Sequence, residues 1–149
     1  MNIIVDAFGG DNAPLAVIEG SAMAVRELGV KVTLTGNEKI IRDTAESHNI
    51  SLENIDILHS DSVIDIHEEP TEIIKSRADC SMAVGLRQLH EGSGDAFVSA
   101  GSTGALVVGA TFIAKRLKGI KRPALAPIMP SDKGYFMLMD AGANVDCRP

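Results

Sequence analysis

The chain has 149 residues, of which 45% are hydrophobic and 23% charged, and its formal net charge is −6. This composition fits one globular domain with a buried core, and the negative charge disfavours nucleic acid as a partner. The sequence has no apolar run of about 18 residues, which a membrane span requires, and residues 1–6 lack the features of a signal peptide, so we expect a cytoplasmic protein.

Short β-branched runs alternate with helical segments along the chain. Strands are predicted at 3–5, 30–35, 55–58, 96–99 and 135–139. Helices are predicted at 14–28, 38–48, 70–75, 81–91 and 104–118. This alternation predicts βαβ units, and therefore an α/β fold of three layers, αβα, with a mostly parallel, Rossmann-like sheet. A further helix is expected after the fifth strand, so we interpret residues 1–149 as the N-terminal part of a single α/β domain.

Two of the predicted helices carry specific expectations. The helix at 14–28 has Asp11 or Asn12 available as its cap, and Gly29 is suited to end it. The helix at 104–118 is apolar nearly all round, which is typical of a helix that lies deep in the fold or in a subunit interface.

The loop after the fourth predicted strand is a candidate anion site. It combines glycines, hydroxyl groups and free backbone N–H groups at the start of a helix, an arrangement that favours phosphate. The candidate phosphate-binding residues are Ser99, Gly101, Ser102, Thr103 and Gly104.

Small or acidic residues follow three of the predicted strands. They are Asp6 with Gly9, Gly10 and Asp11; Ser99 with Gly101 to Gly104; and Asp140 with Gly142 and Asn144. In an open parallel sheet the ligand crevice lies outside the carboxyl ends of the strands, so these loops are expected to share one crevice. The alternative is that the glycines only permit tight turns.

The sequence disfavours nucleotide cofactors. It contains neither a GxxxxGK[ST] loop nor a GxGxxG turn after its first strand, which argues against ATP and NAD. An alternative role for Asp6 and Asp11 is to hold Mg²⁺, although hard cations usually need more converging oxygens than these two side chains offer. We expect no cofactor and no metal site.

Five basic residues fall close together: Lys115, Arg116, Lys118, Lys121 and Arg122. One interpretation is a helix C-terminus whose dipole favours cations, and the other is a docking patch for an acidic partner. Other polar residues have a structural interpretation by default. Cys80 and Cys147 are interpreted as structural thiols, and Glu68 and Glu69 as charges at a helix N-terminus. Lys75 and Arg77 are interpreted as surface charges, and the alternative is that they supply a cation to a bound phosphate.

Four segments together resemble the motifs of a known family. VDAFGGDNAP at 5–14 resembles VDAMGGDxAP, and SAGSTGA at 99–105 resembles SAGNTGA. KGIKRPALAP at 118–127 resembles KGIxRPALAP, and DAGANVD at 140–146 resembles DxGANVD. These are motifs of the PlsX family of bacterial phosphate acyltransferases. Phe8 replaces the usual Met and Ser102 the usual Asn, and Ser102 still offers a hydrogen bond.

The resemblance implies an enzyme that transfers a long acyl chain from acyl carrier protein to inorganic phosphate, forming acyl phosphate for phospholipid synthesis. It also implies a homodimer without cofactors, peripheral association with the inner membrane face, and a fold similar to isocitrate and isopropylmalate dehydrogenases and to phosphotransacetylases. Proteins of this family are longer, so residues 1–149 correspond to the N-terminal part of the catalytic domain. We expect this part alone to be inactive.

Phosphate is itself the nucleophile in such a reaction, so the site mainly has to position it and to stabilise a tetrahedral oxyanion. The candidate catalytic residues are Asp6, Thr103, Asp140 and Asn144. Because acyl carrier protein is acidic, the resemblance favours the docking interpretation of the basic cluster. Two alternatives remain: a phosphotransacetylase-like enzyme acting on a small acyl-CoA, and a non-catalytic phosphate-binding or subunit module.

Overall fold

The structure is a computed structural model that describes residues 1–120 and 124–139. The chain divides into two compact units, Met1–Lys115 and Arg116–Pro149. The first unit contains the α/β fold, and the second contains a two-stranded hairpin.

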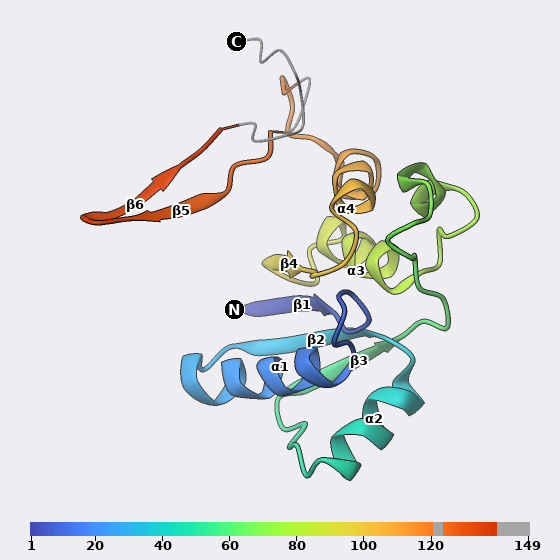
Figure 1. The fold of residues 1–149 in the computed structure, drawn as a ribbon. Helices are drawn as coiled ribbons and strands as arrows, with labels where there is room; N and C mark the ends of the chain where they lie inside the picture. The colour runs from blue at the N-terminus through green and yellow to red at the C-terminus, as the bar shows by residue number, and fades with distance from the viewer. Residues whose placement is uncertain (121–123, 140–149) are drawn as a thin grey trace. The chain divides into compact units, whose positions relative to one another are not determined.

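The first unit is built on a four-stranded parallel sheet (Figure 1). Its strands are β1 (Asn2–Asp6), β2 (Lys31–Gly36), β3 (Ile55–His59) and β4 (Ala96–Val98), in the order β3-β2-β1-β4. The helical segments are α1 (Leu15–Leu28), α2 (Glu38–Ser47), η1 (Pro70–Ile74), α3 (Ser81–His90), α4 (Thr103–Gly109) and η2 (Ala110–Lys115). These elements confirm the predicted α/β fold with a parallel sheet.

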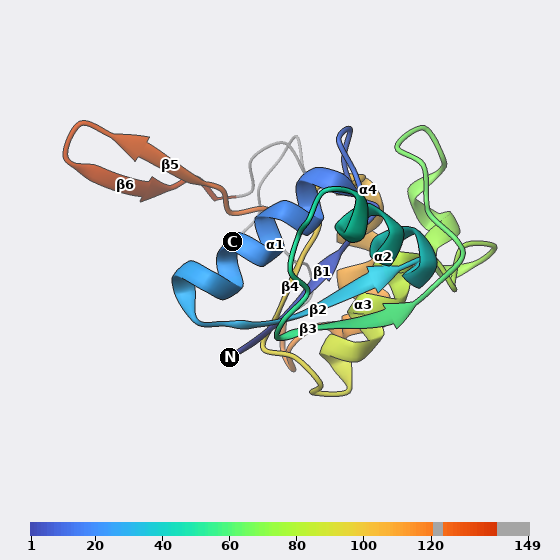
Figure 2. The same cartoon turned by 90° about the horizontal axis from the view of Figure 1, so that it is seen from below.

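Helices cover both faces of the sheet, which gives three layers (Figures 1 and 2). Helices α1 and α2 pack on one face, where Val32 and Leu34 of β2 join Ile18 and Ile41 in a buried core. Helices α3 and α4 lie on the other face, around a second core that includes Leu86 and other apolar side chains. The hydrophobic runs of the strands are explained by this burial on two sides.

The strand order reverses between β1 and β4. Strands β1, β2 and β3 follow one another across the sheet, and the chain then returns through η1 and α3 to place β4 on the other side of β1. Residues Ile3 to Val5 pair in register with Ala96 to Val98. Such a reversal is the point at which open α/β sheets bind ligands, outside the carboxyl ends of the strands.

The ends of α1 confirm one expectation and correct another. Gly29 ends the helix in the left-handed conformation, with φ of 64°, as predicted. The N-cap position is taken by Pro14 and has no side-chain cap, so the prediction that Asp11 or Asn12 caps this helix is wrong.

The apolar segment after β4 forms a shorter helix than predicted. Helix α4 continues into the π-helical η2, which ends at Lys115 rather than at residue 118. Along α4 only Ala105 and Gly109 are buried, and Phe112 of η2 is 61% exposed. The expectation that the whole segment is buried within the fold is therefore wrong. The alternative, that this segment forms a subunit interface, stays a prediction.

The predicted fifth strand does not extend the parallel sheet. It corresponds to β6 (Gly134–Met137), which pairs antiparallel with β5 (Ile128–Ser131) in a separate two-stranded sheet. The three prolines within residues 121–130 predict an irregular connection there, but residues 128–130 lie in β5, and an edge strand tolerates Pro130. The side chains of both strands are exposed. No helix within residues 1–120 and 124–139 has the length and apolar character to cross a membrane.

Candidate functional site

The carboxyl ends of β1 and β4 place Asp6 and Ser99 side by side at the point where the strand order reverses. Asp6 is the last residue of β1, and Ser99 directly follows β4. Because the two strands are paired in register, the loops that follow them leave the sheet together. Two of the three predicted loops therefore meet.

Asp6 is a buried carboxylate held by hydroxyl groups. The residue is only 3% exposed. Oδ1 accepts hydrogen bonds from Ser81 Oγ at 2.6 Å and from the Phe8 amide at 3.3 Å, while Oδ2 accepts one from Ser99 Oγ at 2.8 Å. Hydrogen bonds to an ionised acceptor are among the stronger ones in proteins, so Asp6 ties β1, β4 and α3 together.

The loop from Ser99 to Gly104 is fixed by its own side chains. Ser99 Oγ accepts a hydrogen bond from the Gly101 amide at 3.1 Å, and Ser102 Oγ accepts one from the Ala105 amide at 3.3 Å. Ser102 is thus the N-cap of α4 and is 7% exposed. Thr103 is the first residue of the helix and is exposed.

Gly9 lies close against the loop that follows β4. A Cβ atom at this position would lie 2.6 Å from Ser99 Oγ, 2.8 Å from Asp6 Oδ2 and 2.8 Å from the Gly101 nitrogen. All three distances are shorter than real Cβ contacts, so only glycine fits here without a shift of the loop. Close packing therefore requires glycine at this position, in addition to the tight turn that glycine permits.

A cavity of about 170 Å³ opens where the two loops meet. Its lining includes Gly10 and Asp11 from the first loop, Gly101 and Ser102 from the second, and Asp6 beneath them. This volume is below the range of about 300–1,000 Å³ typical of drug-sized ligands, so it suits a small ligand better than a nucleotide. Three of the lining residues, Asp6, Asp11 and Asp65, are acidic. Among the described residues that line it, none is Lys or Arg.

The predicted phosphate-binding residues therefore take different places. Gly101 and Ser102 line the cavity, whereas Ser99 supports the loop from behind through Asp6. Thr103 and Gly104 begin α4, and a Cβ at Gly104 would lie 2.8 Å from Pro70 Cγ. The sequence left open that Asp6 binds Mg²⁺. In the structure both of its carboxylate oxygens instead accept hydrogen bonds from hydroxyl groups.

Several predicted residues lie outside the described part of the chain. Asp140, Asn144, Lys121, Arg122 and Cys147 belong to this group. Of the remaining basic cluster, Lys115, Arg116 and Lys118 are exposed. Only Lys115 lies in the last turn of η2. A helix dipole acts within the last turn, so it accounts for Lys115 but not for Arg116 or Lys118.

Arg77 and Glu68 form an ion pair that the sequence did not predict. Arg77 Nε lies 2.8 Å from Glu68 Oε2. The hydrogen bond from Arg77 is the main cause that lowers the pKa of Glu68, and the same bond raises the pKa of Arg77. Glu68 thus pairs with Arg77 rather than acting only as a charge at a helix N-terminus. Lys75 is near Thr71 and Glu72.

Cys80 has the structural role that its sequence context predicts. It is fully buried at the start of α3, and it is a free thiol. Burial raises the pKa of this thiol, which disfavours the reactive thiolate form.

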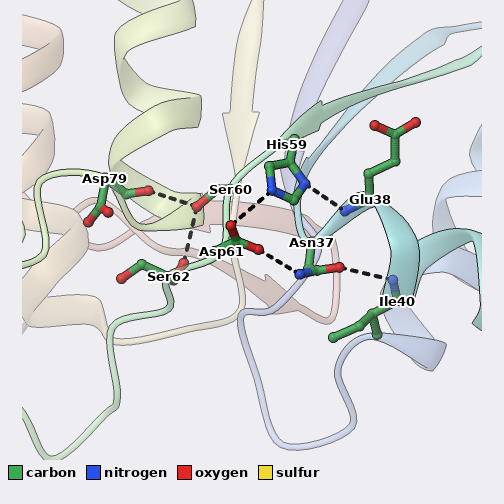
Figure 3. A network of polar contacts seen from close by, with 8 residues as sticks. All are labelled: Asn37, Glu38, Ile40, His59, Ser60, Asp61, Ser62 and Asp79. Atoms are coloured by element: carbon green, nitrogen blue, oxygen red, sulfur yellow. Dashed lines mark hydrogen bonds and ion pairs between the residues drawn. The ribbon is translucent and has the colours of Figure 1, made fainter.

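A second polar cluster lies at the carboxyl ends of β2 and β3 (Figure 3). Asn37 Oδ1 accepts a hydrogen bond from the Ile40 amide and so caps α2, and Asn37 Nδ2 donates to Asp61 at 2.8 Å. His59 Nδ1 accepts from the Glu38 amide at 3.2 Å, and its Nε2 is 3.2 Å from Asp61 Oδ2. Both ring nitrogens are engaged in holding this turn, so His59 has a structural role.

Ser81 is the member of the Asp6 environment that sequence reasoning missed. A serine at the start of a helix usually signals a cap, whereas here Cys80 occupies the N-cap position and the Ser81 hydroxyl turns to Asp6. No motif marks this contact, because the two residues come from distant parts of the chain.

Comparison with known proteins places these features in a family. Residues 1–149 match the family described as fatty acid synthesis protein. A protein of Alkaliphilus oremlandii named phosphate acyltransferase is 41% identical over 149 residues, which cover 100% of this chain and 44% of that protein. A protein of Clostridium kluyveri with the same name is 46% identical, and the match covers 45% of its length. A protein of Clostridium botulinum (strain Langeland), also with this name, is 45% identical, and the match covers 44% of its length. The chain thus spans less than half the length of these curated relatives.

Proposed function

Because this chain belongs to the fatty acid synthesis protein family, we propose that it forms the phosphate-binding part of a phosphate acyltransferase. The enzyme transfers a long acyl chain from acyl carrier protein to inorganic phosphate, and the acyl phosphate serves phospholipid synthesis. The observation that carries the proposal is the small cavity between the β1 and β4 loops, because Gly101 and Ser102 line it at the start of α4. Its lining also includes Asp6, Asp11 and Asp65, so the donors for phosphate have to be backbone N–H groups and hydroxyls. The name shared by the relatives supports the same reaction.

The chemistry asks little of the protein beyond positioning. An oxygen of phosphate attacks the thioester carbonyl, a C–O bond forms, and the C–S bond breaks as the electron pair leaves on sulfur. A thiol has a pKa of about 8.5, so the departing thiolate takes its proton from water without a dedicated acid. The protein therefore has to hold phosphate near the carbonyl and to supply donors to the developing oxyanion.

We assign these tasks to the loop that begins α4. The backbone N–H groups that follow Gly101 and the hydroxyls of Ser102 and Thr103 are the phosphate donors in this proposal, since the Gly101 N–H itself donates to Ser99 Oγ. Ser102 also caps the helix, which fixes the orientation of the donors. Asp6 is assigned to holding the loop through Ser81 and Ser99, and the catalytic role expected from the sequence stays a proposal beside it.

The remaining predicted roles stay proposals. Asp140 and Asn144 orient the thioester or the phosphate loop, and residues 1–149 are the N-terminal part of one catalytic domain. The enzyme works as a cytoplasmic homodimer without cofactor or metal and associates peripherally with the inner membrane face. The basic cluster, Lys115, Arg116, Lys118, Lys121 and Arg122, docks the acidic acyl carrier protein.

An assay of acyl phosphate formation tests the proposed function. The protein from its complete reading frame is incubated with inorganic phosphate and either a long-chain acyl carrier protein or acetyl-CoA. Rapid transfer from the acyl carrier protein is expected, with little from acetyl-CoA and none from residues 1–149 alone. A preference for acetyl-CoA would indicate a phosphotransacetylase-like enzyme. Inactivity with both donors would favour a non-catalytic module.

Charge reversal tests the docking patch separately. Lys118→Glu should raise the Michaelis constant for the carrier substrate and leave that for phosphate unchanged, because it removes attraction to the acidic partner. Lys133→Glu, an exposed lysine in the turn between β5 and β6, is the matched control and should have little effect. Equal behaviour of the two variants would argue against a specific patch.

A further inference from the structure

Ser81 is a fully buried hydroxyl that points away from its own helix. It is the first residue of α3, is 1% exposed, and donates a hydrogen bond to Asp6 Oδ1 at 2.6 Å. The next donor to the same oxygen is the Phe8 amide, at the longer distance of 3.3 Å. Ser81 is therefore the main donor that satisfies this buried carboxylate oxygen.

The bond from Ser81 is the first step of a connected series that ends in the candidate phosphate loop. Ser81 donates to Asp6, Ser99 donates to the other oxygen of Asp6, and the Gly101 amide donates to Ser99 Oγ. The bonds are connected, because Asp6 accepts from both Ser81 and Ser99, and Ser99 Oγ donates to Asp6 and accepts from the Gly101 amide. The backbone of the loop is thus tied to the start of α3 through side chains.

Met82, the next residue of α3, supports the same loop directly. A Cβ atom at Gly101 would lie 3.2 Å from Met82 Cε, which is a tight contact, and Met82 also lines the cavity. It is 1% exposed. The first turn of α3 therefore contacts the loop by packing as well as through the hydrogen-bond series.

We propose that Ser81 is a positioning residue for phosphate: through Asp6 and Ser99 it holds the Gly101–Ser102 backbone in the arrangement that binds the anion. This role rests on the proposed function. Without the Ser81 hydroxyl, Asp6 Oδ1 keeps only the longer bond from Phe8 in a buried setting. The carboxylate is then free to turn, and the hold on Ser99 and Gly101 weakens.

The test compares Ser81→Ala with Ser60→Ala in the protein from its complete reading frame. Ser60 is a matched control, because it is 6% exposed and donates to the carbonyl oxygens of Ser62 and of Asp79, which lies just before α3. Its loss loosens the segment that leads to α3 without removing a bond to Asp6. Thermal unfolding is measured for both variants, together with kcat and the Michaelis constants for phosphate and for the acyl donor.

Ser81→Ala should raise the Michaelis constant for phosphate about tenfold, because the loosened loop no longer holds its donors in the arrangement that binds the anion. The constant for the acyl donor should change less than twofold. Ser60→Ala should lower the unfolding temperature and leave both constants within twofold. In an Asp6→Asn background, Ser81→Ala should add little further effect, since the two residues act in one series.

Two kinds of result would overturn the role of Ser81. The first is equal phosphate constants for Ser81→Ala and Ser60→Ala in an active enzyme, and the second is full additivity of Ser81→Ala with Asp6→Asn. A wild-type protein that neither forms acyl phosphate nor gains thermal stability from inorganic phosphate would overturn the proposed function, and the positioning role with it. The two failures are thus distinguished by the wild-type measurements.

Discussion

Two polar clusters lie at the carboxyl edge of the same sheet, and they differ in burial. The Asp6 cluster (Asp6, Ser81, Ser99, Gly101) joins β1, β4 and α3, and its Asp6 and Ser81 are 3% and 1% exposed. The Asn37 cluster (Asn37, His59, Asp61) joins the ends of β2 and β3 (Figure 3), and the side chains of His59 and Asp61 are 50% and 78% exposed.

The difference follows from topology. Strands β2 and β3 are consecutive and are joined by α2, so the polar groups at their ends only need to cap a helix and complete a turn. Strands β1 and β4 are distant in the chain, and the reversal of strand order between them leaves space that two loops line. Polar groups buried there need internal partners, because water cannot replace them.

The largest effect on stability is expected from Asp6→Ala. The change removes the acceptor of the Ser81 and Ser99 hydroxyls, and the Ser81 hydroxyl then lacks this partner in a fully buried position. The free energy of unfolding should fall by about 3 kcal/mol, measured by urea denaturation. Asp61→Ala, the corresponding change in the Asn37 cluster, should cost no more than about 1 kcal/mol. Similar losses for the two variants would remove the distinction between the clusters.

A smaller loss is expected from Gly9→Ala, because the new Cβ would meet Ser99 Oγ, Asp6 Oδ2 and the Gly101 nitrogen. Overpacking of this kind costs about 2 kcal/mol, and the displaced loop should also bind phosphate more weakly. Gly20→Ala is the control, since it lies within α1 with open space around its Cβ position. It should stabilise the protein by up to about 1 kcal/mol. A neutral Gly9→Ala would show that the loops adapt freely.

Asn37→Ala tests the structural role of the exposed cluster. It removes the side-chain cap of α2 and the bond to Asp61, and the expected loss is about 1 kcal/mol. Acyl transfer should be unchanged, because the Asn37 cluster does not line the cavity between the β1 and β4 loops. A large fall in kcat with unaltered thermal unfolding would instead place this cluster in the active site.

The smallest effect is expected at the partly exposed pair of Glu68 and Arg77, and it depends on pH. Folding lowers the pKa of Glu68 from its ordinary value of 4.5, so the pair stabilises the protein above that pH and loses its effect as the pH falls through the lowered pKa. Wild type should therefore unfold at a slightly higher temperature than Glu68→Gln at pH 7, and the difference should vanish in acid. Arg77→Gln should show the same pH dependence as Glu68→Gln. A difference in unfolding temperature that grows in acid would contradict the stabilising effect assigned to the ionised pair.

The sequence was sufficient to predict the elements of the parallel sheet, because β-branched runs and glycine stops such as Gly29 are local signals. It also led to the Ser99–Gly104 loop, whose hydroxyls and glycines follow a strand. The pairing of β6 with β5 was missed, since strand partners are chosen by contacts that local patterns do not encode. Ser81 was missed for the same reason: its hydroxyl acts on Asp6, which lies far away in the chain.

The most direct test of the phosphate site is a titration of acyl transfer with inorganic phosphate, comparing wild type with Thr103→Val in the protein from its complete reading frame. The substitution keeps the shape of an exposed side chain at the start of α4 and removes its hydroxyl. A several-fold rise in the Michaelis constant for phosphate, with the constant for the acyl donor unchanged, is the predicted result. An unchanged constant for phosphate would contradict the assignment of Thr103 to phosphate binding in this loop.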